Sequence, residues 1–249
     1  MILSNGHEGI REDVDVTLFV PCLNEEQRVL ATLETIHKAL LELKFTYEVI
    51  VVDDGSTDNT AAVVSDYCSQ NPSLPIRLHR NSKNLGLSCS FVNTAFAGRG
   101  RYYRLVCGDN VEPKESLIKI LEEMGKADII IPYYPILPGK SKSRRAISGL
   151  YTRIVNLLSG FKLRYYNGCA LYRRFDVMRW ASYNYGFGFQ AHLITTLLGE
   201  GATFREVAID GFHLTKERGS PLNVRNFLST AHTLVEILIR RMRRIVYGN

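Results

Sequence analysis

The stretch YEVIVVDDGSTDNT, residues 47–60, decides how the chain is interpreted. A short apolar run that is rich in β-branched residues and bounded by turn formers is typical of a parallel strand covered on both faces. This run ends in Asp53 and Asp54, so both carboxylates are expected at the C-terminal edge of the strand. Ligands of open α/β sheets bind at that edge, because loops and helix N-termini converge there. The stretch therefore predicts a ligand site as well as a strand.

The flanking sequence alternates strands with helices. Further strands are predicted at 16–21, 76–80, 102–107 and 127–134, and the segments between them have apolar residues at helical spacing, beginning with a helix over 23–43. Alternation over about the first 130 residues argues for a mostly parallel sheet with right-handed crossovers. The predicted fold class is α/β, with a mostly parallel central sheet flanked by helices.

The second half of the chain is less regular. Residues 135–145 are rich in Pro, Gly, Ser and Lys and predict a mobile loop. Helices are expected at 146–160 and 189–201, and a strand at 203–209. Residues 223–246 form an amphipathic helical pattern with a basic end, which suits either a membrane surface or packing against the sheet. We expect one domain over residues 1–222 and a basic helix over 223–249.

Composition narrows the class of protein. The chain has 249 residues, a formal charge of +6 and a pI near 9.1, which favours anionic partners without choosing among them. Its five cysteines are scattered without metal-ligand spacing, so reduced thiols are expected. The polar N-terminal segment does not match a signal peptide, and no window reaches 18 consecutive apolar residues. These features predict a globular protein that does not span a membrane by itself.

Polar residues follow three of the predicted strands. Asn24, Glu25 and Glu26 follow the first, where they also suit the N-terminus of a helix. Asp53 and Asp54 suit helix capping, but two adjacent carboxylates repel each other unless a cation or hydrogen-bond donors satisfy them. A nucleobase imino group or ribose hydroxyls would supply such donors. This favours a nucleotide at the strand ends.

A third cluster lies after the fourth strand, where Asp109 has Asn110 and Glu112 beside it. Hard oxygen ligands suit Mg²⁺ or Mn²⁺ carried on a diphosphate, which needs only one or two protein carboxylates. The alternative is a Gly-Asp-Asn turn ahead of Pro113. Arg144, Arg145 and Arg218 are either solvated charges or parts of a lid that closes over the diphosphate.

The motifs PCLNEE (21–26), VVDDGSTDNT (51–60) and 80–113, ending in CGDNVEP, together resemble the family 2 glycosyltransferases with a GT-A fold. The segments YNGCALYRR (166–174), FGFQAHLI (187–194) and 205–228 resemble the branch of dolichyl-phosphate mannose synthases and bacterial polyprenyl-phosphate sugar transferases. The resemblance covers about residues 14–235. Several motifs in a fixed order make it far more specific than any single one.

The resemblance implies a nucleotide site and a metal site. The residues that it assigns to the nucleotide are Pro21, Leu23, Asn24, Glu25, Val52, Asp53, Asp54, Gly108 and Asp109. A D-x-D motif then implies Mg²⁺ or Mn²⁺ on the diphosphate, but Cys107 stands at its first aspartate and Asp109 alone remains. Asn110 and Glu112 are the candidates to replace the missing ligand, so the metal set is Asp109 with Glu112. The departure leaves metal dependence and donor identity open.

The resemblance also implies the reaction. Asp109 and the lid residues Arg144, Arg145 and Arg218 would be catalytic in an inverting transfer of a sugar from a GDP- or UDP-linked donor to a polyprenyl or dolichyl phosphate. Gln190 stands where family members that glycosylate hydroxyls carry a carboxylate. A phosphate acceptor is already anionic and needs no general base, whereas a hydroxyl needs one.

The expected partners are the nucleotide-sugar donor, the lipid acceptor and an anionic membrane surface, with no nucleic acid. The expected location is cytoplasmic and peripheral, on the inner membrane face. Two alternatives stay open: transfer to a hydroxyl of a glycan or lipid-linked saccharide, and a nucleotide-binding protein with weakened catalysis.

Overall fold

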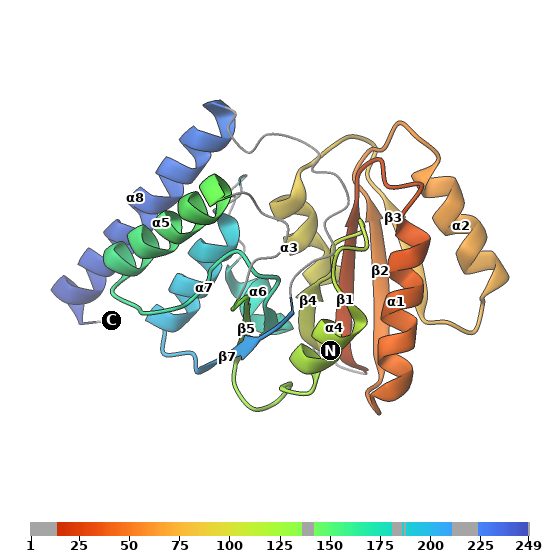
Figure 1. The fold of residues 1–249 in the computed structure, drawn as a ribbon, viewed down its shortest axis with the longest axis horizontal. Helices are drawn as coiled ribbons and strands as arrows, with labels where there is room; N and C mark the ends of the chain where they lie inside the picture. The colour runs from red at the N-terminus through yellow and green to blue at the C-terminus, as the bar shows by residue number, and fades with distance from the viewer. Residues whose placement is uncertain (1–13, 136–141, 181–185, 187, 211–223, 249) are drawn as a thin grey trace, which may run out of the picture.

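The structure is a computed structural model that describes residues 14–135, 142–180, 186, 188–210 and 224–248 (Figure 1). Its centre is a seven-stranded sheet in the order β3-β2-β1-β4-β6-β5-β7. The strands are β1 (Val14–Cys22), β2 (Tyr47–Asp53), β3 (Ile76–Arg80), β4 (Gly100–Leu105), β5 (Ile129–Tyr133), β6 (Leu171–Arg173) and β7 (Phe204–Ala208).

The sheet is mostly parallel, as predicted. β3, β2, β1 and β4 are parallel neighbours, and β5 pairs in parallel with β7. The short strand β6, which the sequence did not predict, lies antiparallel between β4 and β5. It therefore separates two strands that a simple alternating pattern would have made neighbours.

Helices cover both faces of the sheet (Figure 1). The helices are α1 (Val29–Glu42), α2 (Thr60–Gln70), α3 (Leu87–Ala97), α4 (Lys114–Leu121), α5 (Lys142–Ser159), α6 (Arg174–Trp180), α7 (Phe189–Gly199) and α8 (Val224–Tyr247). Strand residues alternate between the two faces. Leu18 and Val20 of β1 pack in the cluster with α1 and α4, whereas Phe19 packs in the cluster with α3 and α7.

Two helices begin at places that the sequence pattern did not predict. α1 starts at Val29, because residues 23–28 form a loop that is hydrogen-bonded to residues 56–60. α5 starts at Lys142, inside the segment expected to be a mobile loop. Arg144 and Arg145 therefore belong to the first turn of a helix. Of the rest of that predicted loop, Pro135 is described, and residues 136–141 lie outside the described residues.

The amphipathic helix predicted at the C-terminal end is present as α8. It runs beside α5 and α7 and buries Thr233 and Ile237 against them, at 0% and 2% exposure. Its opposite face leaves large apolar side chains exposed, at Leu228, Val235, Leu238, Ile239, Met242, Ile245 and Val246. Among the described residues, no helix combines the length and hydropathy that a membrane span requires.

Candidate active site

The carboxyl ends of four parallel strands meet at one edge of the sheet. Cys22 of β1 pairs with Asp53 of β2, which pairs with Arg80 of β3. The pairing continues past the strands, because the N–H of Asp54 donates to the carbonyl of Cys22 at 2.9 Å. On the other side, the N–H of Val106 donates to the carbonyl of Phe19 at 2.8 Å. The three predicted polar clusters therefore leave the sheet at a common edge.

The loops after β1 and β2 are hydrogen-bonded to each other. Asn24 has a φ of 58°, in the left-handed region that Asn tolerates better than most residues. Its N–H donates to Ser56 Oγ at 3.0 Å, and its Oδ1 accepts from the N–H of Thr57 at 2.9 Å. The N–H of Glu25 donates to Thr60 Oγ1 at 2.8 Å. Asn24 and Glu25 thus shape this loop pair, whatever else they bind.

The adjacent aspartates differ in their surroundings. Asp54 accepts from four donors: Asn81 Nδ2 at 2.7 Å, the N–H groups of Leu85 and Gly86 at 2.9 Å each, and Ser90 Oγ at 3.3 Å. The protein therefore supplies the donors that the paired carboxylates were expected to need. Asp54 holds the loop ahead of α3 and has little capacity left for a ligand.

Asp53 is the other member of the pair, and its side chain is fully buried. Its Oδ1 accepts from the N–H of Ser56 at 2.9 Å, and Arg80 Nε lies 3.3 Å from its Oδ2. Arg80 is 64% exposed, so it can move away from Asp53 Oδ2 when a ligand supplies the donors that replace it. The sequence analysis did not single out Arg80, although its position at the end of β3 was the available signal.

The loop after β4 approaches β1 closely. A Cβ at Gly108 would lie 2.7 Å from both Cys22 Sγ and the carbonyl oxygen of Pro21, so only glycine fits there. This contact fixes the position of the next residue, Asp109. Pro21 and Val52 are themselves parts of β1 and β2.

Asp109 has the property that a cation ligand requires. Its Oδ1 is buried and has no hydrogen-bond partner among the described residues. Burial raises the pKa of Asp109, and Arg28 opposes that rise, followed by the backbone N–H groups of Asp109 and Val111. A buried carboxylate oxygen without a donor is unfavourable, and a cation would satisfy it. Asp109 therefore fits the Mg²⁺ or Mn²⁺ that the motif implies.

Glu112 has a different position from the one expected for a metal ligand. Its two oxygens accept from Arg104 Nη2 at 2.5 Å and Arg104 Nη1 at 3.0 Å, and Arg104 is 1% exposed. Burial lowers the pKa of Arg104, but Glu112 outweighs it and the net shift is upward. Both carboxylate oxygens of Glu112 are therefore engaged by Arg104, which makes Glu112 a poor candidate for the metal. Asn110 Oδ1 accepts from Thr35 Oγ1 at 3.0 Å.

Cys107, at the first position of the D-x-D pattern, lies beside Cys169 of the NGCA segment. A hydrogen bond with Cys169, then burial, raise the pKa of Cys107 well above its ordinary value. The thiol stays protonated at neutral pH and is a poor ligand for a hard cation. Within the described part of the chain, no three His, Cys, Asp or Glu side chains gather as a metal cluster. Asp109 is thus a single carboxylate anchor.

The remaining predicted residues are spread more widely. Leu23 is 44% exposed, and Arg145 is exposed in the first turn of α5. Arg144 shares that turn, and Arg218 lies outside the described residues. Gln190 is in the first turn of α7, and its Oε1 is buried without a hydrogen-bond partner among the described residues. The lid role of the three arginines stays a prediction.

Residues 17–180 match the profile described as glycosyl transferase family 2. The chain belongs to this family. A dolichyl-phosphate beta-glucosyltransferase from Dictyostelium discoideum is 31% identical over 122 residues, which are 47% of this chain and 37% of that protein. A dodecaprenyl-phosphate galacturonate synthase from Rhizobium johnstonii is 27% identical over 169 residues, which are 64% of this chain and 47% of that protein. The family 2 chain thus spans less than half the length of either relative.

Solved structures confirm the GT-A fold of this family 2 chain. The mannosyltransferase PcManGT from Pyrobaculum calidifontis, in complex with GDP-Man and Mn²⁺, has a TM-score of 0.64 at 16% identity, covering 92% of this chain and 64% of that one. Glucosyl-3-phosphoglycerate synthase from Mycobacterium tuberculosis, in complex with Mn²⁺, UDP and phosphoglyceric acid, has a TM-score of 0.68 at 14% identity, covering 91% and 79%. At these identities the likeness concerns the fold.

Proposed function

We propose that this protein is an inverting glycosyltransferase that moves a sugar from a nucleoside-diphosphate sugar to a polyprenyl phosphate. The observation that carries the proposal is the unpartnered, buried Oδ1 of Asp109 at the edge where the strand loops converge. The names of the relatives support it, since both act on a polyprenyl-type phosphate. The donor is a GDP- or UDP-linked hexose.

The donor lies along the strand ends in this proposal. Asp53 accepts from the base or ribose once Arg80 moves aside, and Pro21, Leu23, Asn24 and Glu25 line the same side. Gly108, packed against β1, holds the loop that places Asp109 beside the diphosphate. A Mg²⁺ or Mn²⁺ ion held by Asp109 would neutralise charge on the leaving diphosphate. Two solved relatives of the fold carry Mn²⁺, which suits that choice.

Basic residues complete the donor site. Arg144, Arg145 and Arg218 approach the diphosphate from the side of α5 and of the segment before α8. Their charges stabilise the leaving group as the bond to the sugar breaks. The first turn of α5 gives Arg144 and Arg145 a firmer base than a loop would.

The acceptor follows from the side chain at Gln190. An amide does not remove a proton, so a hydroxyl acceptor would lack a general base at this position. A phosphate monoester has a second pKa of about 6 and is largely ionised at neutral pH. It therefore attacks the sugar carbon directly, from the side opposite the diphosphate.

The acceptor's long hydrocarbon places the reaction at a membrane. Residues 223–249 would rest on the inner, cytoplasmic face through the exposed apolar face of α8, while residues 1–222 carry the chemistry. The exposed Leu238, Met242 and Ile245 would enter the interface, with nearby arginines at the anionic headgroups.

The test is a transfer assay with UDP-glucose or GDP-mannose as donor, Mn²⁺, and dolichyl or undecaprenyl phosphate as acceptor. We expect lipid-linked sugar from the wild-type protein, and a rate lower by about 10²-fold or more for Asp109→Asn. Asp66→Asn is the matched control, because Asp66 is exposed on α2. UDP and GDP, each with Mn²⁺, should raise the thermal midpoint only where they bind the folded protein.

Three results would contradict the proposal. Full activity of Asp109→Asn would reject the metal assignment. Transfer to a saccharide hydroxyl in place of the lipid phosphate would reject the acceptor. Nucleotide stabilisation without product from any donor would instead favour a nucleotide-binding protein with weakened catalysis.

A further inference from the structure

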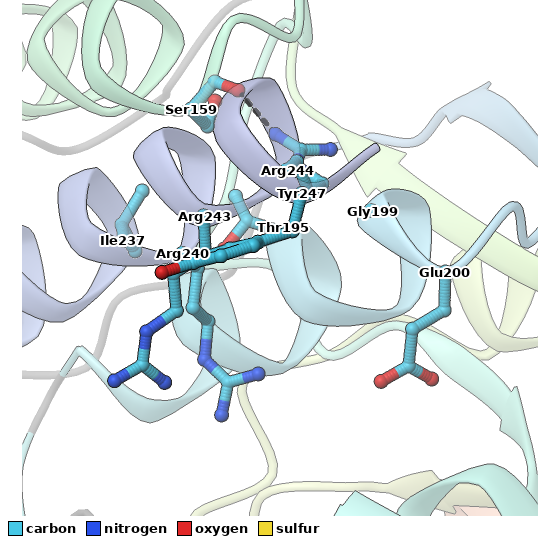
Figure 2. Close-up of a pocket in the computed structure, with 9 residues that line it drawn as sticks. All are labelled: Ser159, Thr195, Gly199, Glu200, Ile237, Arg240, Arg243, Arg244 and Tyr247. Carbon is cyan, nitrogen blue, oxygen red and sulfur yellow. Dashed lines mark hydrogen bonds between the residues drawn. The ribbon is translucent and has the colours of Figure 1, made fainter. Parts of the chain in front are cut away.

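A pocket of about 530 Å³ opens where α5, α7 and α8 end (Figure 2). Its lining includes Ser159 of α5, Gly199 of α7 and five residues of α8: Ile237, Arg240, Arg243, Arg244 and Tyr247. All the residues given for its lining belong to α5, α7 and α8 or directly follow α7, and none belongs to β1, β2, β3, β4 or the loops after these strands. The pocket is therefore distinct from the strand edge.

The pocket concentrates positive charge. Arg240 and Arg243 are exposed, and no ion pair with either is found among the described residues. Figure 2 shows their guanidinium groups extending on the same side of α8, with Glu200 set apart. Glu200 is the acidic residue of the lining, and it pairs with Arg179 at 3.1 Å. It therefore does not neutralise the two arginines.

A third arginine is fixed in place. Arg244 Nη2 donates to the carbonyl of Ser159 at 2.8 Å, and its guanidinium carbon lies 4.7 Å from the ring centre of Phe161. These contacts hold one positive group at the wall, while the two exposed groups of Arg240 and Arg243 extend from α8. Ile237, only 2% exposed, and the ring of Tyr247 add apolar surface.

The positive charge of Arg240 affects the pKa of a neighbouring side chain, His192. Burial, followed by Arg240 and His232, lowers the pKa of His192 to about 4. Glu236 lies 3.5 Å from His192 Nε2, yet the net shift is downward. Arg240 thus acts on His192 in the same direction as burial, which is the larger cause.

The position of the pocket relative to the apolar face of α8 indicates which kind of ligand it would bind. With 3.6 residues per turn, Val235, Ile239, Met242 and Val246 fall on one line along the helix. Arg240, Arg243 and Tyr247 fall on a parallel line about a quarter-turn away. If the apolar line rests on a bilayer, the arginines stand at the level of the headgroup phosphates.

We propose that Arg240 and Arg243, with Arg244 held at the wall of the pocket, form a phosphate-binding site, whose ligand is a phosphate mono- or diester. Guanidinium forks match phosphate oxygens, and two of them on the same side of a helix suit a tetrahedral anion. The phosphate comes either from an anionic lipid headgroup or from a soluble phosphate ester. Binding to this site can be measured without donor or turnover, so it is tested independently of the transferase reaction.

The experiment compares the full chain with Arg240→Gln/Arg243→Gln. Both residues are exposed, so the fold should be unaffected, and circular dichroism checks that. The control with matched charge is Lys44→Gln/Arg101→Gln, since both residues are exposed and lie far from α8. One arm measures binding of sn-glycerol 3-phosphate by calorimetry. The other measures co-sedimentation with vesicles of phosphatidylcholine, with and without phosphatidic acid.

We expect the pocket variant to lose affinity on the order of tenfold in at least one arm, while the control variant keeps wild-type affinity. A loss with phosphatidic acid vesicles identifies a lipid headgroup. A loss restricted to glycerol phosphate identifies a soluble ester. If the pocket and control variants behave alike in both arms, or the wild type binds neither probe, the proposal is wrong. Transfer activity enters neither arm, so these results are separate from those of the transfer assay.

Discussion

The strand-edge loops and the helical layer of α5, α7 and α8 differ in how their polar groups are satisfied. At the edge, internal hydrogen bonds hold the loops, and Asp54 alone accepts four of them. In the helical layer, Arg240 and Arg243 stand exposed beside apolar side chains that are 40% exposed or more. The first region is organised to hold one geometry, and the second to meet something outside the protein.

The comparison predicts its largest stability effect at the edge. Arg104→Met leaves Glu112 as a buried carboxylate without its two donors, and we expect the free energy of unfolding to fall by about 3–5 kcal/mol. Urea denaturation measures it. The double variant Arg104→Met/Glu112→Leu should recover most of the loss, because no buried charge then remains. A double variant as unstable as the single one would show that packing, and not charge, dominates.

An effect of intermediate size is expected where α7 meets α8. His192 has a folded pKa of about 4, lower than its unfolded value of 6.5. Between these values the unfolded chain binds a proton that the folded protein does not, so stability falls as pH decreases. From pH 7 to pH 5 the loss should be about 2 kcal/mol.

His192→Asn tests this dependence, since it removes the titrating group. The change in stability between pH 7 and pH 5 should be smaller in the variant by about that amount. Each protein is compared with itself at the two pH values, so the lost hydrogen bond from Trp180 Nε1 does not enter the difference. Equal pH dependence in both proteins would assign the acid loss to other groups.

The smallest effect on stability is expected on the exposed face of α8. Leu238→Ser/Met242→Ser should change the free energy of unfolding by about 0.5 kcal/mol or less, because both side chains are already exposed. Binding to vesicles should nevertheless fall severalfold. Leu41→Ser/Phe96→Ser is the matched control, with 72% and 55% exposure. Unchanged vesicle binding by the α8 variant would remove this face from the proposed membrane contact.

Much of the strand-edge region was predictable from local sequence. The β-branched run before Asp53 and Asp54 marks a parallel strand, and the neighbouring strands follow the same rule. β6 was missed because it has three residues, and its partners lie far away in the sequence. The late start of α1 depends on Asn24 and its contacts with the loop after β2, which no helical pattern reveals.

The candidate site was also predictable only in part from the sequence. Position after a strand correctly brought the three polar clusters to one edge. It could not separate Asp109, with an unpartnered oxygen, from Glu112, which is paired with Arg104. That distinction depends on which side chains point inward across β4 and the loop after it. Spacing in the sequence does not contain this information.

The insertion of β6 between β4 and β5 also sets an order for assembly as the chain emerges from a ribosome. Strands β1 to β4 are complete by Leu105 and can pair with one another at once. β5 must wait for residues 171–173 and 204–208, and until then its apolar Ile129, Ile130 and Ile131 have no partner strand. Contacts between such distant segments form slowly. Until they form, exposed apolar surface and an unpaired strand edge can associate with other chains. The nascent protein is therefore most vulnerable to aggregation after strands β1 to β4 have already formed.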